Sequence, residues 1–135
     1  MTATSENVQT DWIASLKSKP TVTTLLINGG ANEVRECEWQ GDKFQYPNIR
    51  VGIDFMPSIE GCGPDDADVY IEVFSAEKSS KECAHIASTI VPLYHKIPFE
   101  INGRRYSTVV VRKVPKPERS IYAWVTKIHI FAQVV

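Results

Sequence analysis

Phe99-Glu-Ile-Asn-Gly-Arg-Arg-Tyr106 is the stretch that decides the fold, because an Asn-Gly pair stands between two extended segments. A two-residue type I′ turn needs positive φ angles at both central positions, and Asn-Gly adopts them with little strain. The stretch therefore predicts a β-hairpin with Asn102 and Gly103 at its tip. The strand that returns from this hairpin is expected over residues 104–114.

Further strands are expected on both sides of the hairpin in the sequence. Residues 47–55 and 67–75 alternate apolar and polar side chains with a period of two, which is typical of half-buried strands. A short strand is expected around Val34, and residues 121–134 should form the last long strand. Residues 115–119, which include two prolines, are expected to form a turn or an extended loop.

Two segments have apolar residues at helical spacing. The first runs over residues 6–18 with Ser5 as its N-cap, and a short second turn follows over residues 21–27. The serine pair at 79–80 supplies the N-cap of the next helix, which presents one apolar stripe. Pro92 lies inside this helix and is expected to kink it or to end it early.

Together these elements predict a single α+β domain over residues 1–135, with residues 1–5 flexible. Neighbouring strands joined by turns favour an antiparallel arrangement. We therefore expect a mainly antiparallel β-sheet of about four to five strands, with two helices packed on one face. A chain of 135 residues has the usual size for one hydrophobic core.

Features of export or membrane insertion are not expected. The N-terminal residues lack a basic stretch followed by an apolar one, so we expect no signal peptide. The most apolar run, residues 121–135, is interrupted by polar side chains and is too short to span a bilayer. Three cysteines at irregular spacing argue against a disulfide framework and favour a reducing, cytoplasm-like compartment.

The residue patterns favour neither a metal site, nor a cofactor, nor an enzyme. Cys62 and the stretch Cys83-Ala-His85 lack the paired spacing of zinc ligands, and Cys83 lies on the apolar stripe of its helix. A Cys–His nucleophile pair also lacks a third, orienting group. The acidic loop over residues 60–68 is spaced too irregularly for a calcium-binding EF-hand.

Charge is distributed unevenly along a chain whose formal net charge is −1. Residues 1–77 contain 13 acidic and 5 basic side chains (−8), whereas residues 78–135 contain 3 acidic and 10 basic ones (+7). Either the two halves neutralise each other within one molecule, or an acidic face of one subunit meets a basic face of the next. The charged residues singled out as an interface are Glu60, Asp65, Asp66, Asp68, Arg104, Arg105, Arg112, Lys113, Lys116 and Arg119.

The order of elements follows a recognisable pattern over most of the chain. Residues 16–25 close the first helix, Tyr46-Pro-Asn-Ile-Arg-Val-Gly-Ile53 is a proline-led strand, and Asp68-Val-Tyr-Ile-Glu-Val-Phe-Ser75 is the next strand. A helix, a strand bearing Gly103 and Arg105, and a final long strand complete it. This pattern resembles the small tail-terminator and tail-completion (neck, head-tail joining) proteins of long-tailed bacteriophages.

The resemblance implies a structural virion protein with no enzyme activity and no cofactor. Its implied partners are further copies of itself in a homohexameric ring, the tail tube protein and the head-connector or stopper protein. DNA would be only a passing cargo, and no membrane would be involved. The implied location is the tail or neck of the virion, after assembly in the host cytoplasm. The charged residues above could supply subunit or tail-tube contacts, with the loop 60–68 facing the lumen or the tube.

Two other functions stay open from the residues alone. A small enzyme or ligand-binding domain acting as a dimer could line a pocket with Trp39, Tyr122 or Trp124, and could use His85 or Asp54 as acid or base. Nucleic-acid binders usually combine a basic net charge with stacking aromatic residues, whereas this chain is slightly acidic. An accessory protein of that kind would use Arg104, Arg105 and Lys113.

Overall fold

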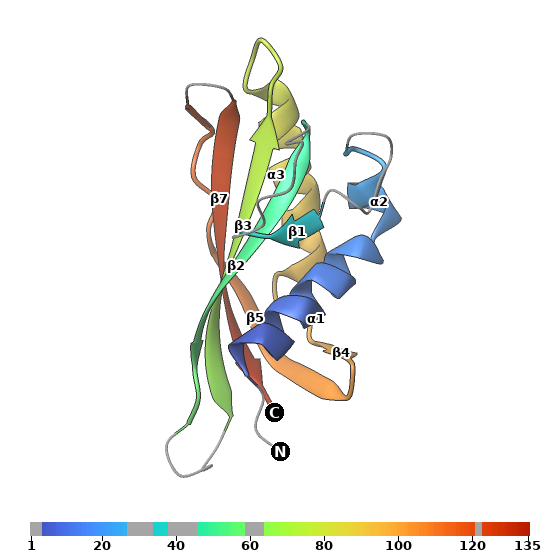
Figure 1. Cartoon of the computed structure of the whole chain (residues 1–135), viewed down its shortest axis with the longest axis vertical. Coiled ribbons are helices and arrows are strands. Elements are labelled where there is room, and N and C mark those ends of the chain that lie inside the picture. Colours follow the sequence, from blue (N-terminus) through green and yellow to red (C-terminus); the bar gives the residue numbers. More distant parts are fainter. Residues whose placement is uncertain (1–3, 27–33, 38–45, 59–63, 121–122) are drawn as a thin grey trace.

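The structure is a computed structural model that describes residues 4–26, 34–37, 46–58, 64–120 and 123–135. A single twisted β-sheet runs along the long axis of the molecule, and the helices lie together on one of its faces (Figure 1). None of the described helices combines the length and the apolar character that crossing a bilayer requires. Of the residues singled out in the sequence, those outside the described ranges are Trp39, Glu60, Cys62 and Tyr122.

The described residues form seven strands in the order β1-β2-β3-β7-β5-β4, with β6 paired to the start of β7. Their bounds are β1 Val34–Glu36, β2 Asn48–Met56, β3 Asp65–Ser75, β4 Phe99–Ile101, β5 Arg104–Lys113, β6 Glu118–Arg119 and β7 Trp124–Val134. β7 is the last strand in sequence but the central one in space, and it pairs antiparallel with β3, β5 and β6. The α+β class is as expected, but the sheet is larger than the four to five strands predicted.

The sheet is also mixed, because β1 pairs with β2 in parallel. Val34 lies opposite Ile49, and the backbone N–H of Cys37 donates to the carbonyl of Val51 at 2.9 Å. A parallel pair is joined by a crossover connection and not by a tight turn. The sequence therefore contained no turn signal from which the direction of β1 could be inferred.

The hairpin predicted from Asn-Gly is confirmed. Asn102 and Gly103 have φ angles of 52° and 78°, both positive as a type I′ turn requires. The strands on either side, β4 and β5, pair antiparallel with Phe99 opposite Tyr106.

Helix α1 spans Ser5–Lys17 and the short α2 spans Pro20–Thr23. The N-cap of α1 is Thr4 and not Ser5. The backbone N–H of Asn7 donates to Thr4 Oγ1 at 3.2 Å, and the backbone N–H of Thr4 donates to Asn7 Oδ1 at 3.2 Å. Such a reciprocal capping box needs a side-chain acceptor three residues after the cap, and only Thr4 has one, because Val8 follows Ser5 at that spacing.

Helix α3 spans Lys81–Tyr94 and continues past Pro92, so the expected early end does not occur. A proline this close to the end of a helix disturbs few of its hydrogen bonds. The last turn is also held from outside, because the Tyr94 ring is buried and its hydroxyl lies 2.8 Å from Ser15 Oγ on α1.

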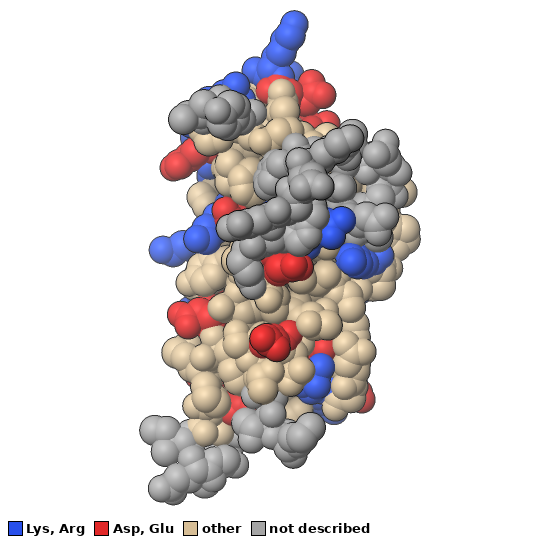
Figure 2. Space-filling view, in the orientation of Figure 1, with Lys and Arg blue, Asp and Glu red and all other residues tan. Residues whose placement is uncertain are grey.

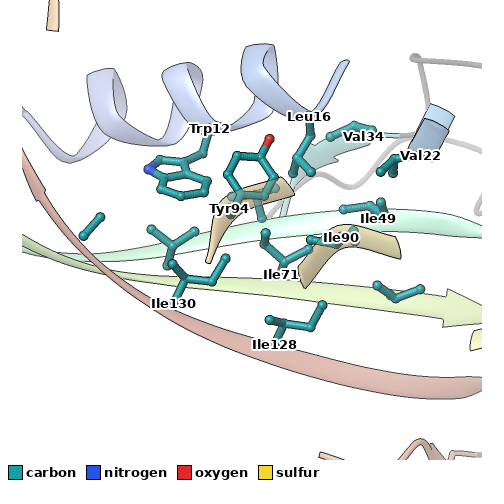
Figure 3. Close-up of a cluster of buried hydrophobic side chains, with 14 of the residues drawn as sticks. Trp12, Leu16, Val22, Val34, Ile49, Ile71, Ile90, Tyr94, Ile128 and Ile130 are labelled. Carbon is teal, nitrogen blue, oxygen red and sulfur yellow. The ribbon is translucent and has the colours of Figure 1, made fainter. Parts of the chain in front are cut away.

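The core lies between the helices and the inner face of the sheet (Figure 3). Trp12 of α1 sits at its centre, with its ring 5.0 Å from that of Tyr94 and 5.8 Å from that of Tyr106. Ile71 and Ile130 contribute from the central strands. Full burial of one such large side chain stabilises the fold by about 1.5–3 kcal/mol, so α1 is an integral part of the domain.

Candidate functional site

The face of the sheet opposite the helices is the candidate functional surface. On β3, the buried residues Val69, Ile71 and Val73 alternate with half-buried ones, and β7 alternates in the same way. Successive side chains of a strand point to opposite faces, so the half-buried set faces away from the core. We call this face the open sheet face; it comprises the half-buried residues Asp68, Tyr70, Glu72, His129 and Phe131 and the exposed residues Lys127 on β7 and Arg112 on β5.

A row of aromatic and charged groups crosses the open sheet face. Tyr70 and His129 lie directly opposite each other on β3 and β7, and their rings stack with centroids 4.9 Å apart and planes 17° apart. On one side of this stack, Lys127 Nζ lies 4.9 Å from the centre of the Tyr70 ring. On the other side, His129 Nε2 lies 2.9 Å from Asp68 Oδ1. These groups hold one another in place while remaining partly exposed.

A second cation–aromatic pair lies beside this row. The guanidinium carbon of Arg112 is 4.9 Å from the centre of the Phe131 ring. Towards β6 the surface is hollowed into a cleft of about 310 Å³, lined by Glu72, Pro115, Lys116, Glu118, Arg119, Ser120, Val125 and Lys127. The lining of this cleft combines apolar surface with charged side chains of both signs.

Asp65 and Asp66 were expected in the loop before this strand, but the structure places both in β3, together with Asp68. The strand begins two residues earlier than predicted because long strands, β2 and β7, pair with it on both sides. The loop-like composition is compensated by hydrogen bonds to the carboxylates. The Ser58 N–H donates to Asp65 Oδ1 at 2.7 Å, and Gln133 Nε2 donates to Asp66 Oδ1 at 3.2 Å.

The basic residues that the sequence singled out fall into two groups at opposite ends of β5. Arg104 and Arg105 lie next to the β4–β5 turn, and the strand from there to Lys113 covers roughly 30 Å. The second group lies where β5 ends and continues into the β5–β7 connection, and it consists of Arg112, Lys113, Lys116 and Arg119. On the side of the molecule shown in Figure 2, basic and acidic side chains are scattered among uncharged ones.

Arg104 is not a free surface cation, because Asp11 holds it. The Asp11 side chain is fully buried on α1 and accepts hydrogen bonds from Asn102 Nδ2 at 2.8 Å, from Tyr106 Oη at 2.6 Å and from Nε and one terminal nitrogen of Arg104. Burial raises the pKa of Asp11, but these hydrogen bonds and the positive charge of Arg104 outweigh it, so the pKa lies below its ordinary value. A charged Asp11 therefore fastens α1 to the β4–β5 hairpin.

Reasoning from the sequence missed Asp11, although a signal for it existed. Asp11 lies three residues after Val8 and directly before Trp12, on the apolar stripe of the helix. A charged side chain at such a position must be paired, because burying an unpaired charge costs several kcal/mol. The position of Asp11 in the sequence indicates that it has a partner. Only the fold shows that this partner is the β4–β5 hairpin.

The structure brings together none of the catalytic combinations considered from sequence within its described part. Cys83 Sγ donates to the carbonyl of Val73 at 3.3 Å, and burial raises the pKa of this thiol, which makes it a neutral packing group. His85 lies on α3, whereas Asp54 points away from the core on the other face of the sheet. No cluster of three or more His, Cys, Asp or Glu that could hold a metal ion occurs among the described residues.

Fold and surface together define an α+β domain with one helix-covered sheet face and one open sheet face. No protein-family model matches the chain, and no curated protein matches it in sequence. Among solved structures, a chain described as "Virion of native gene transfer agent (GTA) particle" is similar with a TM-score of 0.73 at 12% identity, covering 94% of this chain and 93% of that one. A second solved chain has a TM-score of 0.68 at 14% identity, covering 98% of this chain and 96% of that one. These likenesses show a common fold over nearly the whole length.

Proposed function

We propose that this chain is a structural component of a phage-like virion, in which it forms a homohexameric ring that ends the tail tube and joins it to the head. The observation that carries the proposal is the likeness, over 94% of the chain, to a protein of a gene transfer agent virion. The resemblance of the sequence pattern to tail-terminator and tail-completion proteins supports the more specific role.

The open sheet face supports assembly in preference to catalysis. Aromatic and arginine side chains are enriched in protein interfaces, and here Tyr70, Phe131 and Arg112 lie on the same face of the sheet. In this proposal the chain has neither enzyme activity nor a cofactor. Its partners are further copies of itself, the tail tube protein and the head-connector or stopper protein, and DNA passes through as cargo.

The ring is tested by native mass spectrometry of the purified chain over a wide range of concentration, at low and moderate salt. We expect a discrete hexamer, and ring-shaped particles in negative-stain electron microscopy of the same sample. A dimer as the largest species would contradict the ring and would favour a small ligand-binding or enzymatic dimer. A monomer at the highest soluble concentration would also contradict a ring formed by this chain alone.

The virion location has an independent test. Particles purified from producing cells on a density gradient should contain the chain at a low, fixed ratio to the major capsid protein, as measured by quantitative mass spectrometry. Absence of the chain from intact particles, together with its presence in the cell lysate, would contradict a structural role in the virion.

A further inference from the structure

We infer that one copy of this chain docks onto the next through two oppositely charged patches, one at the β2–β3 end of the sheet and one where β5 ends. The inference rests on the proposed ring, which by itself specifies neither patch. The acidic patch consists of Asp54, Met56 and Asp66. The basic patch consists of Arg112, Lys113, Val114, Lys116 and Arg119.

The acidic patch surrounds an exposed apolar side chain. Met56 is the last residue of β2 and is 46% exposed, and it lies directly opposite Asp66 on β3. Asp54, two residues earlier, points to the same face and is exposed. Figure 1 shows this end of β2 and β3 reaching past the helices.

The basic patch has the same construction with the opposite sign. Val114 follows β5 and is 44% exposed, and the exposed residues Lys113 and Lys116 flank it. Arg112 is held over the Phe131 ring, which restricts its conformations before any partner arrives. One acid, Glu118, lies in the same stretch, so the basic excess is not complete.

Complementarity of charge favours a second copy of this chain as the occupant. An apolar centre with a polar rim is the usual anatomy of a protein interface, and opposite charges on the two sides steer and orient the encounter. Within the part of the chain that the structure describes, neither patch contains a residue engaged in an ion pair. The large apolar side chains that are exposed there are Met56, Ile97, Val114 and Val135, of which one belongs to each patch.

The two patches cannot neutralise each other within one molecule. They are separated by the widths of β3 and β7 and by several residues along the strands, which places Met56 about 20 Å from Val114. Contact between two different patches is head-to-tail, and such contacts generate a closed ring when the rotation between copies closes. The geometry thus fits the symmetry that the proposed function requires.

Charge-swap complementation tests this pairing. The variant Asp54→Lys/Asp66→Lys has two basic patches, and the variant Arg112→Glu/Lys113→Glu/Lys116→Glu has two patches of net negative charge. Each variant alone should associate at least about tenfold more weakly than the wild type in sedimentation velocity, because like charges now face each other. An equimolar mixture should assemble again, with the two variants alternating in the complexes seen by native mass spectrometry.

Matched controls separate the effect of the patches from the effect of net charge. Glu6→Lys/Glu77→Lys changes the net charge by the same amount as the first variant, and Lys17→Glu/Lys78→Glu/Lys81→Glu by the same amount as the second. All five of these side chains are exposed and lie outside both patches. The controls should assemble like the wild type, and circular dichroism should show the same folded spectrum for every variant.

Each outcome decides the inference. Association of the wild type and of both patch variants with equal affinity overturns the pairing but leaves the ring intact. Variants that are monomeric alone and do not recover on mixing also overturn it, because the patches then do not face each other. A wild-type chain that never associates overturns the ring itself and this inference with it. Recovery on mixing, lost at high salt, supports it.

Discussion

Replacement of Asp11 by alanine should destabilise the fold by about 2–4 kcal/mol, although the residue belongs to no surface that we assign to function. Asp11 accepts hydrogen bonds from three residues, Asn102, Arg104 and Tyr106, all of which lie on the β4–β5 hairpin. Its removal leaves a buried Tyr106 hydroxyl and the Arg104 guanidinium without their acceptor. The contact between α1 and the β4–β5 hairpin then loses the hydrogen bonds and the ion pair that Asp11 makes.

The size of this destabilisation depends on how far water can reach the groups that lose Asp11 as their acceptor. Breaking a fully buried ion pair by removing one partner costs about 3–5 kcal/mol. The Arg104 side chain is 26% exposed, so its charge can be partly rehydrated in the variant, and the cost falls towards the lower part of that range. The Tyr106 hydroxyl is fully buried and contributes about 1–3 kcal/mol as an unsatisfied donor.

Urea unfolding of a double-mutant cycle measures this coupling. The cycle compares wild type, Asp11→Ala, Arg104→Met and the double variant, all with unchanged m-values. We expect a coupling free energy of about 1–3 kcal/mol between the two sites. Tyr106→Phe, which removes only the hydroxyl, is the milder control and should cost about 1 kcal/mol. A loss below about 0.5 kcal/mol for Asp11→Ala, within the range of ordinary surface substitutions, would refute the reasoning.

The same residue predicts a dependence on pH. Because the pKa of Asp11 is lower in the folded than in the unfolded chain, its stabilising contribution is complete above the ordinary value of 3.8 and is lost as the pH falls through the folded value. The difference in unfolding free energy between the wild type and Asp11→Asn should therefore be constant near neutral pH and should narrow in acid. A difference that widens in acid would mean that the assigned sign is wrong.

Three further predictions concern other parts of the core and the hairpin. Tyr94→Phe should cost about 1 kcal/mol in urea unfolding, because it removes the hydroxyl that contacts Ser15; burial raises the pKa of Tyr94 to about 12, so this phenol should not ionise below pH 11 in the native protein. In native protein a thiol reagent should modify the exposed Cys37 long before the buried Cys83, and equal rates would contradict the packing role of Cys83. Gly103→Ala should lower the free energy of unfolding by about 1 kcal/mol, because alanine is strained at φ 78°. A Cβ at this position meets no atom within 4 Å, so a steric clash adds nothing to this cost. An unchanged stability would show that the turn relaxes.

Features that depend on neighbouring residues were predictable from the sequence. The Asn102-Gly103 turn, the presence of strand β2 and the apolar stripe of α3 all depend on residues a few positions apart. Strand β3 was predictable in spite of its aspartates, because Val69, Ile71 and Val73 recur with a period of two. Only its first residue was predicted wrongly, at position 67 in place of Asp65.

Features that depend on distant pairing were not predictable. The start of β3 at Asp65 is set by β7, and the direction of β1 is set by its contact with β2. Arg50 occupies a polar position in the alternation of residues 47–55, yet it is only 2% exposed. Arg104 was interpreted as a surface cation because its partner on α1 lies 93 residues away in sequence. The second patch of the proposed interface likewise becomes visible only when the sheet order is known.

Because β7 lies between β3 and β5 in the sheet, it determines when the fold can be completed during synthesis of the chain. The β2–β3 and β4–β5 hairpins consist of strands close together in sequence, and each can form while the chain is still being made. They become one sheet only through β7, which the ribosome synthesises after the strands of both hairpins. Until then the two halves present unpaired edges and apolar faces, and a nascent chain at this stage is a natural client for chaperones. The complete sheet can therefore form only after the residues of β7, Trp124–Val134, have been synthesised.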